Sequence, residues 1–172
     1  MHKRLRALVL LQLVILIAGC GRESVPPAAP LGPEAWLPLA IGAVAFEAQI
    51  ALTASEQQRG LMHRDSLPEN GGMLFPYPQP QQMSFWMANT RIPLDIGFFD
   101  ASGLLLEVHR MVPYDTNPTR SRGRDLQFAL EMNAGWFARN GLYPGQRMDT
   151  ALLAEALRRR GADPRRYGLA AE

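Results

Sequence analysis

Short stretches in which apolar and polar residues alternate recur along the chain, and Gly and Pro residues separate them. Alternation with a period of two is typical of a half-buried strand, and Gly and Pro mark the turns between strands. The segment 39–52 predicts one strand or two, with Gly42 as the break. Further strands are expected at 73–75, 104–112, 126–132 and 146–148. The pattern therefore predicts a mostly β domain.

Residues 83–100 form the centre of this pattern. The apolar run at Phe85–Met87 ends at the polar pair Asn89-Thr90, and Pro93 leads into a second apolar run that contains Asp95. We expect a strand, a tight turn and a second strand, paired as a hairpin. Because the connections look too short for crossover helices, parallel βαβ units are not expected. The fold class predicted is a small antiparallel β-sandwich or barrel.

Two or three short helices complete the predicted domain. Thr53 and Glu56 fit a capping box at the start of a helix that runs to about Leu61. A second short helix is expected at 134–139. The last begins at Asp149 or Thr150, carries an apolar stripe and stops near Gly161, and the tail beyond it is expected to be loose.

The first residues have the pattern of a targeting segment. Basic residues precede an apolar run at 7–18, which is too short to span a membrane comfortably. The run ends in small residues before Cys20, and this resembles a bacterial lipoprotein signal. We expect residues 1–19 to be a signal peptide, Cys20 to be lipidated, and 20–38 to be a Pro-rich tether. The alternative is an ordinary secretory signal cleaved nearby, with an incidental cysteine.

Charge and cysteine content change with this processing. The chain has 18 basic and 16 acidic residues, and removal of Lys3, Arg4 and Arg6 leaves a net charge of −1. We therefore expect no nucleic-acid partner. Cys20 is the only cysteine, so its acylation would leave no thiol for a disulfide, a nucleophile or a metal ligand. No cofactor and no metal are expected.

Several strings of residues resemble the domain of unknown function 192 family, in the family's order. They are Arg-Gly-Leu-Met-His-Arg at 59–64, Gly-Met-Leu-Phe at 72–75, Phe-Trp-Met-Ala-Asn-Thr-Arg-Ile-Pro-Leu-Asp-Ile at 85–96 and Leu-Glu-Met-Asn-Ala-Gly-Trp at 130–136. The resemblance implies a jelly-roll-like, commonly exported β domain, here at 39–148, and it carries no established activity. The C-terminal helix and tail at 149–172 lie beyond the pattern, and the Arg-rich loop at 116–126 looks longer than is usual.

Trp86, Asn89 and Asp95 are the first candidates for a site. Together they could supply an aromatic wall, an amide and a carboxylate to a small polar pocket. The alternative is structural, because Asn and Asp side chains often bond the backbone of a tight turn. An isolated carboxylate such as Asp95 inside an apolar strand needs a partner in either case.

His109 and Glu131 are the second candidates. Glu107 and His109 lie two apart in a strand, and with Asp95 or Glu131 nearby they could form an acid/base pair or a weak metal site. The alternative is a polar strand surface. Arg59 could bind an anion, or it could pair with Asp95 or Glu131 and hold its helix on the sheet.

These residues lead to three functional hypotheses. The first is a binding or accessory lipoprotein of the bacterial envelope, facing the periplasm, that recognises a small molecule, a glycan or a protein. Its candidate binding residues are Trp86, Asn89, Asp95, His109 and Glu131. The rival is an envelope enzyme that uses Asp95, His109 and Glu131 in a polar pocket. A purely structural role in envelope assembly is the third.

Overall fold

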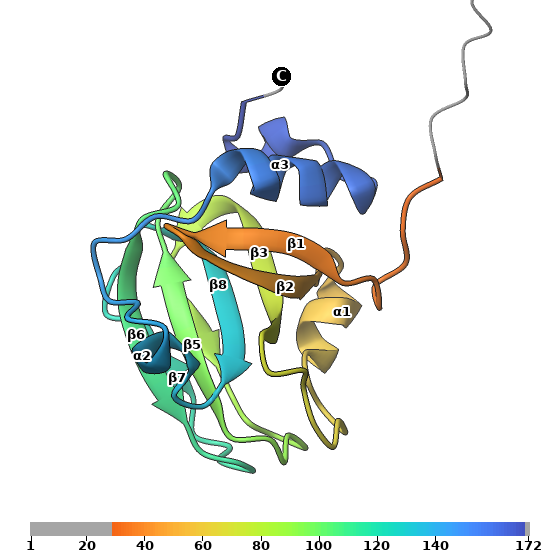
Figure 1. Ribbon diagram of the computed structural model, residues 1–172. Helices are drawn as coiled ribbons and strands as arrows, with labels where there is room; N and C mark the ends of the chain where they lie inside the picture. Colours follow the sequence, from red (N-terminus) through yellow and green to blue (C-terminus); the bar gives the residue numbers. More distant parts are fainter. Residues whose placement is uncertain (1–28, 171–172) are drawn as a thin grey trace, which may run out of the picture.

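A six-stranded sheet dominates the computed structural model, which describes residues 29–170 (Figure 1). The strand order is β1-β2-β3-β8-β5-β6, and a separate pair is formed by β4 and β7. The strands span Leu37–Ile41 (β1), Val44–Ile50 (β2), Gly71–Gln81 (β3), Ser84–Phe85 (β4), Leu94–Phe99 (β5), Leu105–Met111 (β6), Thr119–Arg120 (β7) and Leu126–Asn133 (β8). The mostly β fold with short helices is confirmed, and residues 29–170 form no closed barrel.

One connection contradicts the expectation of a purely antiparallel sheet. β2 and β3 pair in parallel, and the chain between them carries the helix α1, Ala54–Arg59. A parallel pair needs a crossover of about a dozen residues or more, and the stretch from Ala51 to Asn70 supplies it. The prediction of a purely antiparallel sheet was wrong because the helix and the loop after it together form this crossover.

The expected hairpin within 83–100 does not form. β4 pairs with β7, whereas β5 lies between β6 and β8. Every residue of β5 is buried, which suits an interior strand covered on both faces and not one arm of a hairpin. The residues between β4 and β5 instead form turns that bond to other loops.

The sheet buries a hydrophobic cluster on each face. The α3 face carries Leu74, Phe99 and Leu130, which pack with residues of α2 (Trp136–Arg139) and α3 (Thr150–Arg159). The α1 face carries Phe75, Ile96 and Phe98, which pack with the residues around α1 and β4. Alternation along each strand assigns its residues to these two faces in turn.

The helices begin where the sequence predicts. Thr53 accepts a hydrogen bond from the backbone N–H of Glu56, and Glu56 accepts one from the N–H of Thr53, which confirms the capping box. Asp149 caps α3. The tail beyond α3 is not loose, because a 3-10 helix at Pro164–Tyr167 follows and Tyr167 and Leu169 are buried in the cluster on the α3 face.

The segment before β1 is fastened to the domain. Buried Arg160 donates hydrogen bonds to the carbonyl oxygens of Leu31 and Ile50 and to the carboxylate of Glu56. β1 also begins at Leu37, inside the expected tether. The signal peptide and Cys20 lie outside the described residues. No helix within 29–170 is long and apolar enough to span a membrane.

Candidate functional site

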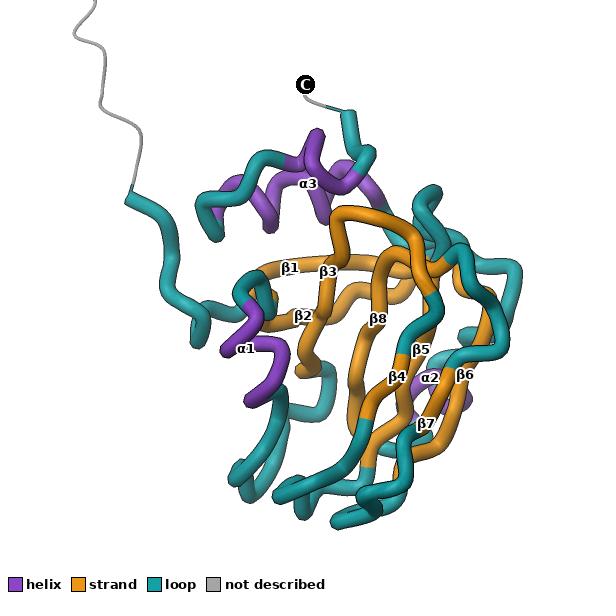
Figure 2. The backbone as a smooth tube through the Cα atoms, turned by 180° about the vertical axis from the view of Figure 1, so that it is seen from behind, coloured by secondary structure: helices purple, strands orange, loops and turns teal. Residues whose placement is uncertain are grey.

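Three loops meet at one end of the sheet, below α1 in Figure 2. The backbone N–H of His63 donates to the carbonyl of Asn89 (2.9 Å), and that of Tyr114 donates to the carbonyl of Thr90 (3.1 Å). His63, Asn89 and Tyr114 have φ angles of 64°, 54° and 62°, and no other non-glycine residue of 29–170 has a positive φ. Strained backbone of this kind persists where neighbouring structure enforces it, and it is frequent at binding sites.

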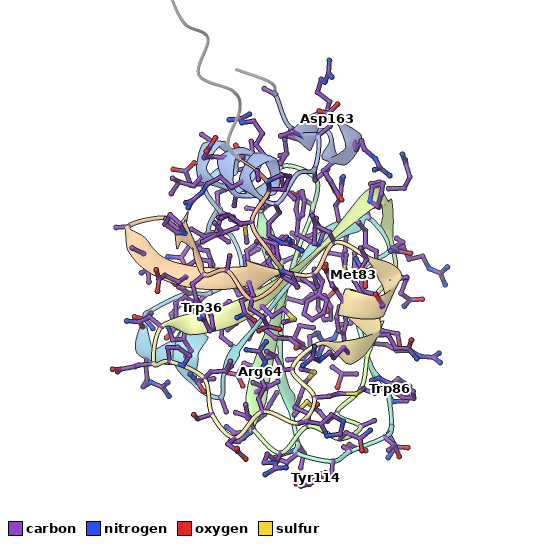
Figure 3. The ribbon with its side chains drawn as sticks, turned by 90° about the vertical axis from the view of Figure 1, so that its right-hand side faces the viewer. Trp36, Arg64, Met83, Trp86, Tyr114 and Asp163 are labelled. Carbon is purple, nitrogen blue, oxygen red and sulfur yellow. The ribbon has the colours of Figure 1, made fainter. Side chains whose placement is uncertain are left out.

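An open groove of about 450 Å³ lies beside these loops. Trp86 forms one wall and is 52% exposed, which is unusual for a side chain of its size. Asn89, Gln58 and Arg59 add polar groups to the lining. Figure 3 shows Trp86 at the margin of the molecule, on the same side as α1. The structure therefore places two of the predicted site residues, Trp86 and Asn89, in one groove.

A narrow recess of about 30 Å³ adjoins the groove and shares Gln58, Arg59, Met62 and Trp86 with it. Glu131, on the interior strand β8, lines this recess. Its residue is only 5% exposed, and none of the described residues donates a hydrogen bond to its carboxyl group. Every side-chain nitrogen or oxygen of 29–170 that is fully buried has a hydrogen-bond partner. The Glu131 carboxyl group has none, so it is not fully buried, and it opens into the recess that it lines.

Burial raises the pKa of Glu131 to about 8. An apolar environment penalises the ionised form of a carboxyl group, and no neighbouring cation offsets that penalty here. The cross-strand neighbours of Glu131 are Met73 and Ile96, both of them apolar. Glu131 is therefore mostly a neutral acid at pH 7, able to donate a hydrogen bond into the recess.

Asp95 does not belong to this groove. It lies on β5 but faces the other side of the sheet from Ile96, so it faces away from Glu131. Its Oδ2 accepts a hydrogen bond from the backbone N–H of Gly135 (2.7 Å), just before α2. This contact is the structural alternative foreseen for Asp95, a carboxylate that holds a turn.

His109 is also separate from Glu131. The two residues flank Ile96 on opposite sides, so two strand spacings, roughly 10 Å, lie between their backbones. His109 Nε2 instead lies 2.6 Å from Glu107 Oε2. Although burial acts to raise it, the pKa of Glu107 is lowered by hydrogen bonds from the backbone of Arg122 and Gly123 and from His109.

The proposed catalytic set of Asp95, His109 and Glu131 is therefore not assembled. Strand alternation places Asp95 on the α3 face, and the width of β5 separates the other two. The sequence could not reveal this, because it depends on which strands are neighbours. Within residues 29–170, no three side chains of His, Cys, Asp or Glu gather in a way that could hold a metal ion.

Comparison with known proteins identifies the family of the chain. The family model DUF192, described as an uncharacterised ACR, matches residues 38–150. The chain belongs to the DUF192 family. No curated protein matches it.

Two solved structures share the fold. One is a protein of unknown function from Novosphingobium aromaticivorans DSM 12444, at 35% identity and a TM-score of 0.63, with 72% of this chain and 94% of that chain covered. The other, from Sinorhizobium meliloti 1021, is described as a candidate transcription regulator, at 30% identity and a TM-score of 0.61, with 66% and 91% covered. Neither description establishes an activity for this DUF192 domain.

Most of the residues that line the groove belong to the strings 59–64 and 85–96, which carry the DUF192 resemblance. Gln58 and Met62 line both the groove and the recess, yet sequence reasoning did not select them. Met62 belongs to the string at 59–64, which was the available signal. Arg59 does not pair with Asp95 or Glu131, as had been considered, but has Glu34 Oε1 4.0 Å from its Nη1.

Proposed function

We propose that this protein is a lipid-anchored glycan-binding module of the bacterial envelope, and that the Trp86 groove holds a saccharide ring. The observation that carries the proposal is the exposed indole of Trp86 along a groove that also presents the polar side chains of Gln58 and Asn89. A ring of this kind offers an apolar face for stacking while its edges stay in water. Sugar rings also combine an apolar face with hydroxyl groups at the edge.

The remaining lining supports the same ligand class. Asn89 and Gln58 each carry an amide that can both donate and accept hydrogen bonds, as sugar hydroxyls require. The volume of about 450 Å³ lies in the range usual for small-ligand sites. The three loops that shape the groove are bonded to one another through backbone groups, so the site is held in place before a ligand arrives.

The location in the envelope is part of this proposal. It rests on the apolar run at 7–18 and the small residues before Cys20. Cys20→Ser should abolish incorporation of a labelled fatty acid and should release the protein from the membrane fraction. Labelling that persists in the variant would contradict the lipid anchor, although it would leave the groove proposal untouched.

Ligand binding can be measured on the full chain in detergent micelles by tryptophan fluorescence. Suitable probes are N-acetylglucosamine oligomers and soluble muramyl peptides, because both occur in the bacterial envelope. We expect saturable quenching, and Trp86→Ala should weaken binding by about 5- to 150-fold, since loss of one stacking contact costs roughly 1–3 kcal/mol. Binding to the variant is followed by calorimetry.

Tyr143→Ala is the matched control. Tyr143 is an equally exposed aromatic side chain (61%), but it does not line the groove. This variant should bind as the parent does. The proposal is overturned if no probe binds the parent, or if Trp86→Ala and Tyr143→Ala bind with the same affinity.

A further inference from the structure

We infer that the saccharide bound in the Trp86 groove is an amino sugar that also carries an anionic group, with its ammonium on Glu131 and its anion on Arg59. This inference rests on the proposed function and adds the chemical class of the ligand. It is drawn from the two charged side chains that line the recess beside Trp86.

Glu131 supplies the first part of the argument. Its carboxyl group is buried, opens into the recess and receives no hydrogen bond from the described residues. A buried carboxyl without a partner is costly unless something arrives to satisfy it. An ammonium group satisfies it best, because the pair then gains both a charge-assisted hydrogen bond and mutual neutralisation.

The volume of the recess limits which group of the ligand can reach Glu131. About 30 Å³ is enough for one or two water-sized groups, and an ammonium group is of that size. An acetamido group adds three further heavy atoms at the same nitrogen and exceeds this space. The recess therefore fits a free amine, whereas an N-acetylated sugar must keep its acetamido group outside it, in the open groove.

Arg59 supplies the second charge. It lines both the recess and the open groove, so a ligand that reaches Glu131 passes its guanidinium. Its side chain is 72% exposed, and its closest acidic atom is Glu34 Oε1 at 4.0 Å. A guanidinium group offers a fork of donors that matches carboxylate and phosphate groups. Arg64 is not equivalent, because it is hydrogen-bonded to Glu34 and Gln49.

Apart from Arg59, the described residues place no basic side chain in the recess beside Glu131. On β3, the neighbouring group is the phenol of Tyr77. Its pKa is raised by burial and by the charge of Glu131. On β6, His109 is bonded to Glu107. On β5, Asp95 faces the other side of the sheet. Arg59, at the end of α1, is the only basic side chain that lines the recess.

Binding of an ammonium group should therefore release a proton. At pH 7 the free protein holds Glu131 as a neutral acid, since burial raises its pKa to about 8. When the ammonium enters, the carboxyl ionises to form the pair and its proton passes to the solvent. A neutral saccharide would accept a hydrogen bond from Glu131 and would release none.

Four probes that share one hexose ring separate the two charges. They are glucosamine 6-phosphate, N-acetylglucosamine 6-phosphate, glucose 6-phosphate and glucosamine. Titration calorimetry on the full chain at pH 7, in two buffers of different ionisation enthalpy, measures affinity and proton release together. We expect glucosamine 6-phosphate to bind at least tenfold more tightly than each of the other three, with release of up to one proton.

Two variants test which side chain binds each charged group of the ligand. Glu131→Gln keeps the shape and neutral state of the native side chain, and it should abolish both the preference for the free amine and the proton release. Arg59→Gln should abolish the preference for the phosphate while proton release is retained. Circular dichroism checks that both variants are folded.

The outcomes separate this inference from the proposed function. If the sugars bind in a Trp86-dependent manner but the amine gives no preference, or if Glu131→Gln retains the proton release, the inference is overturned and the proposed function stands. If none of the four probes and none of the envelope glycans binds, both fall.

Discussion

Two buried carboxyl groups on adjacent strands have opposite surroundings. Asp95 on β5 faces the α3 side of the sheet, and Glu131 on β8 faces the α1 side. Their exposed fractions are similar, at 7% and 5%. The carboxylate of Asp95 accepts the N–H of Gly135, whereas that of Glu131 has no donor among the described residues. Burial alone therefore does not distinguish a structural carboxylate from one that is available to a ligand.

The packing around the two residues explains the difference. On the α3 face, a Cβ atom added to Gly97 would lie 2.7 Å from the ring of Phe137, so α2 is pressed against the strand. That close approach brings the backbone of Gly135 within reach of Asp95. On the α1 face, the residues around Glu131 leave a recess beside its carboxyl group. The comparison predicts how each face responds to substitution.

The largest effect is expected for Glu131 and depends on pH. Its pKa in the folded protein, about 8, is above its ordinary value of 4.5, so the folded state holds a proton that the unfolded state has released. Stability should therefore fall as the pH rises from about 4.5 to about 8. Glu131→Gln removes this dependence, and relative to the parent it should gain on the order of 3 kcal/mol between pH 5 and pH 8.

Urea unfolding of parent and variant at pH 5, 6.5 and 8 measures this difference directly. The contributions of other titrating groups cancel in the comparison. Parallel pH profiles for the two proteins would show that Glu131 is not a buried neutral acid, and the contrast with Asp95 would then disappear.

A smaller effect is expected for Asp95→Ala, a loss of about 2 kcal/mol in the free energy of unfolding. The substitution leaves the partly buried N–H of Gly135 without an acceptor at the start of α2. Asp95→Asn is the control, because an amide oxygen can still accept that hydrogen bond. Thermal unfolding measures both variants. If the alanine variant matches the parent in stability, the Gly135 contact does not hold this face closed.

The smallest effect concerns the helix beside the groove. Thr53→Ala removes the side-chain half of the capping box of α1, at a cost of about 1 kcal/mol. The cost should appear as faster hydrogen exchange in α1, while the amides of β5 stay protected. Ser55→Ala is a nearby control, because it removes only the contact between the Ser55 and Thr53 hydroxyl groups (3.1 Å) and keeps the hydrogen bond from Glu56 N–H to Thr53. Equal exchange in the two variants would exclude a role for the cap.

Local features of the fold were predictable from the sequence. The capping box at Thr53 and the Asp149 cap depend on residues three or fewer positions apart. The alternation in 126–132 likewise locates the strand β8. The DUF192 strings then identified the family, because their order along the chain is specific.

The pairing of strands was not predictable in the same way. The expected hairpin failed because β4 pairs with β7, a segment more than thirty residues further along the chain. The faces of Asp95 and Glu131 follow only once β5 and β8 are known to be neighbours. Sequence reasoning could thus choose Trp86, Asn89 and Glu131 as polar-site residues, but it could not show that Asp95 and His109 belong elsewhere.

The contacts of Arg160 have a mechanical consequence. Its guanidinium joins Leu31, ahead of the first strand, to the end of β2, to Glu56 in α1 and to the end of its own helix. A force applied to the chain ahead of residue 29 would act on the hydrogen bonds of Arg160 before it could separate β1 from β2. The loops around Trp86 make none of these bonds, so tension applied ahead of residue 29 would reach the groove only through α1, which carries Gln58 and Arg59.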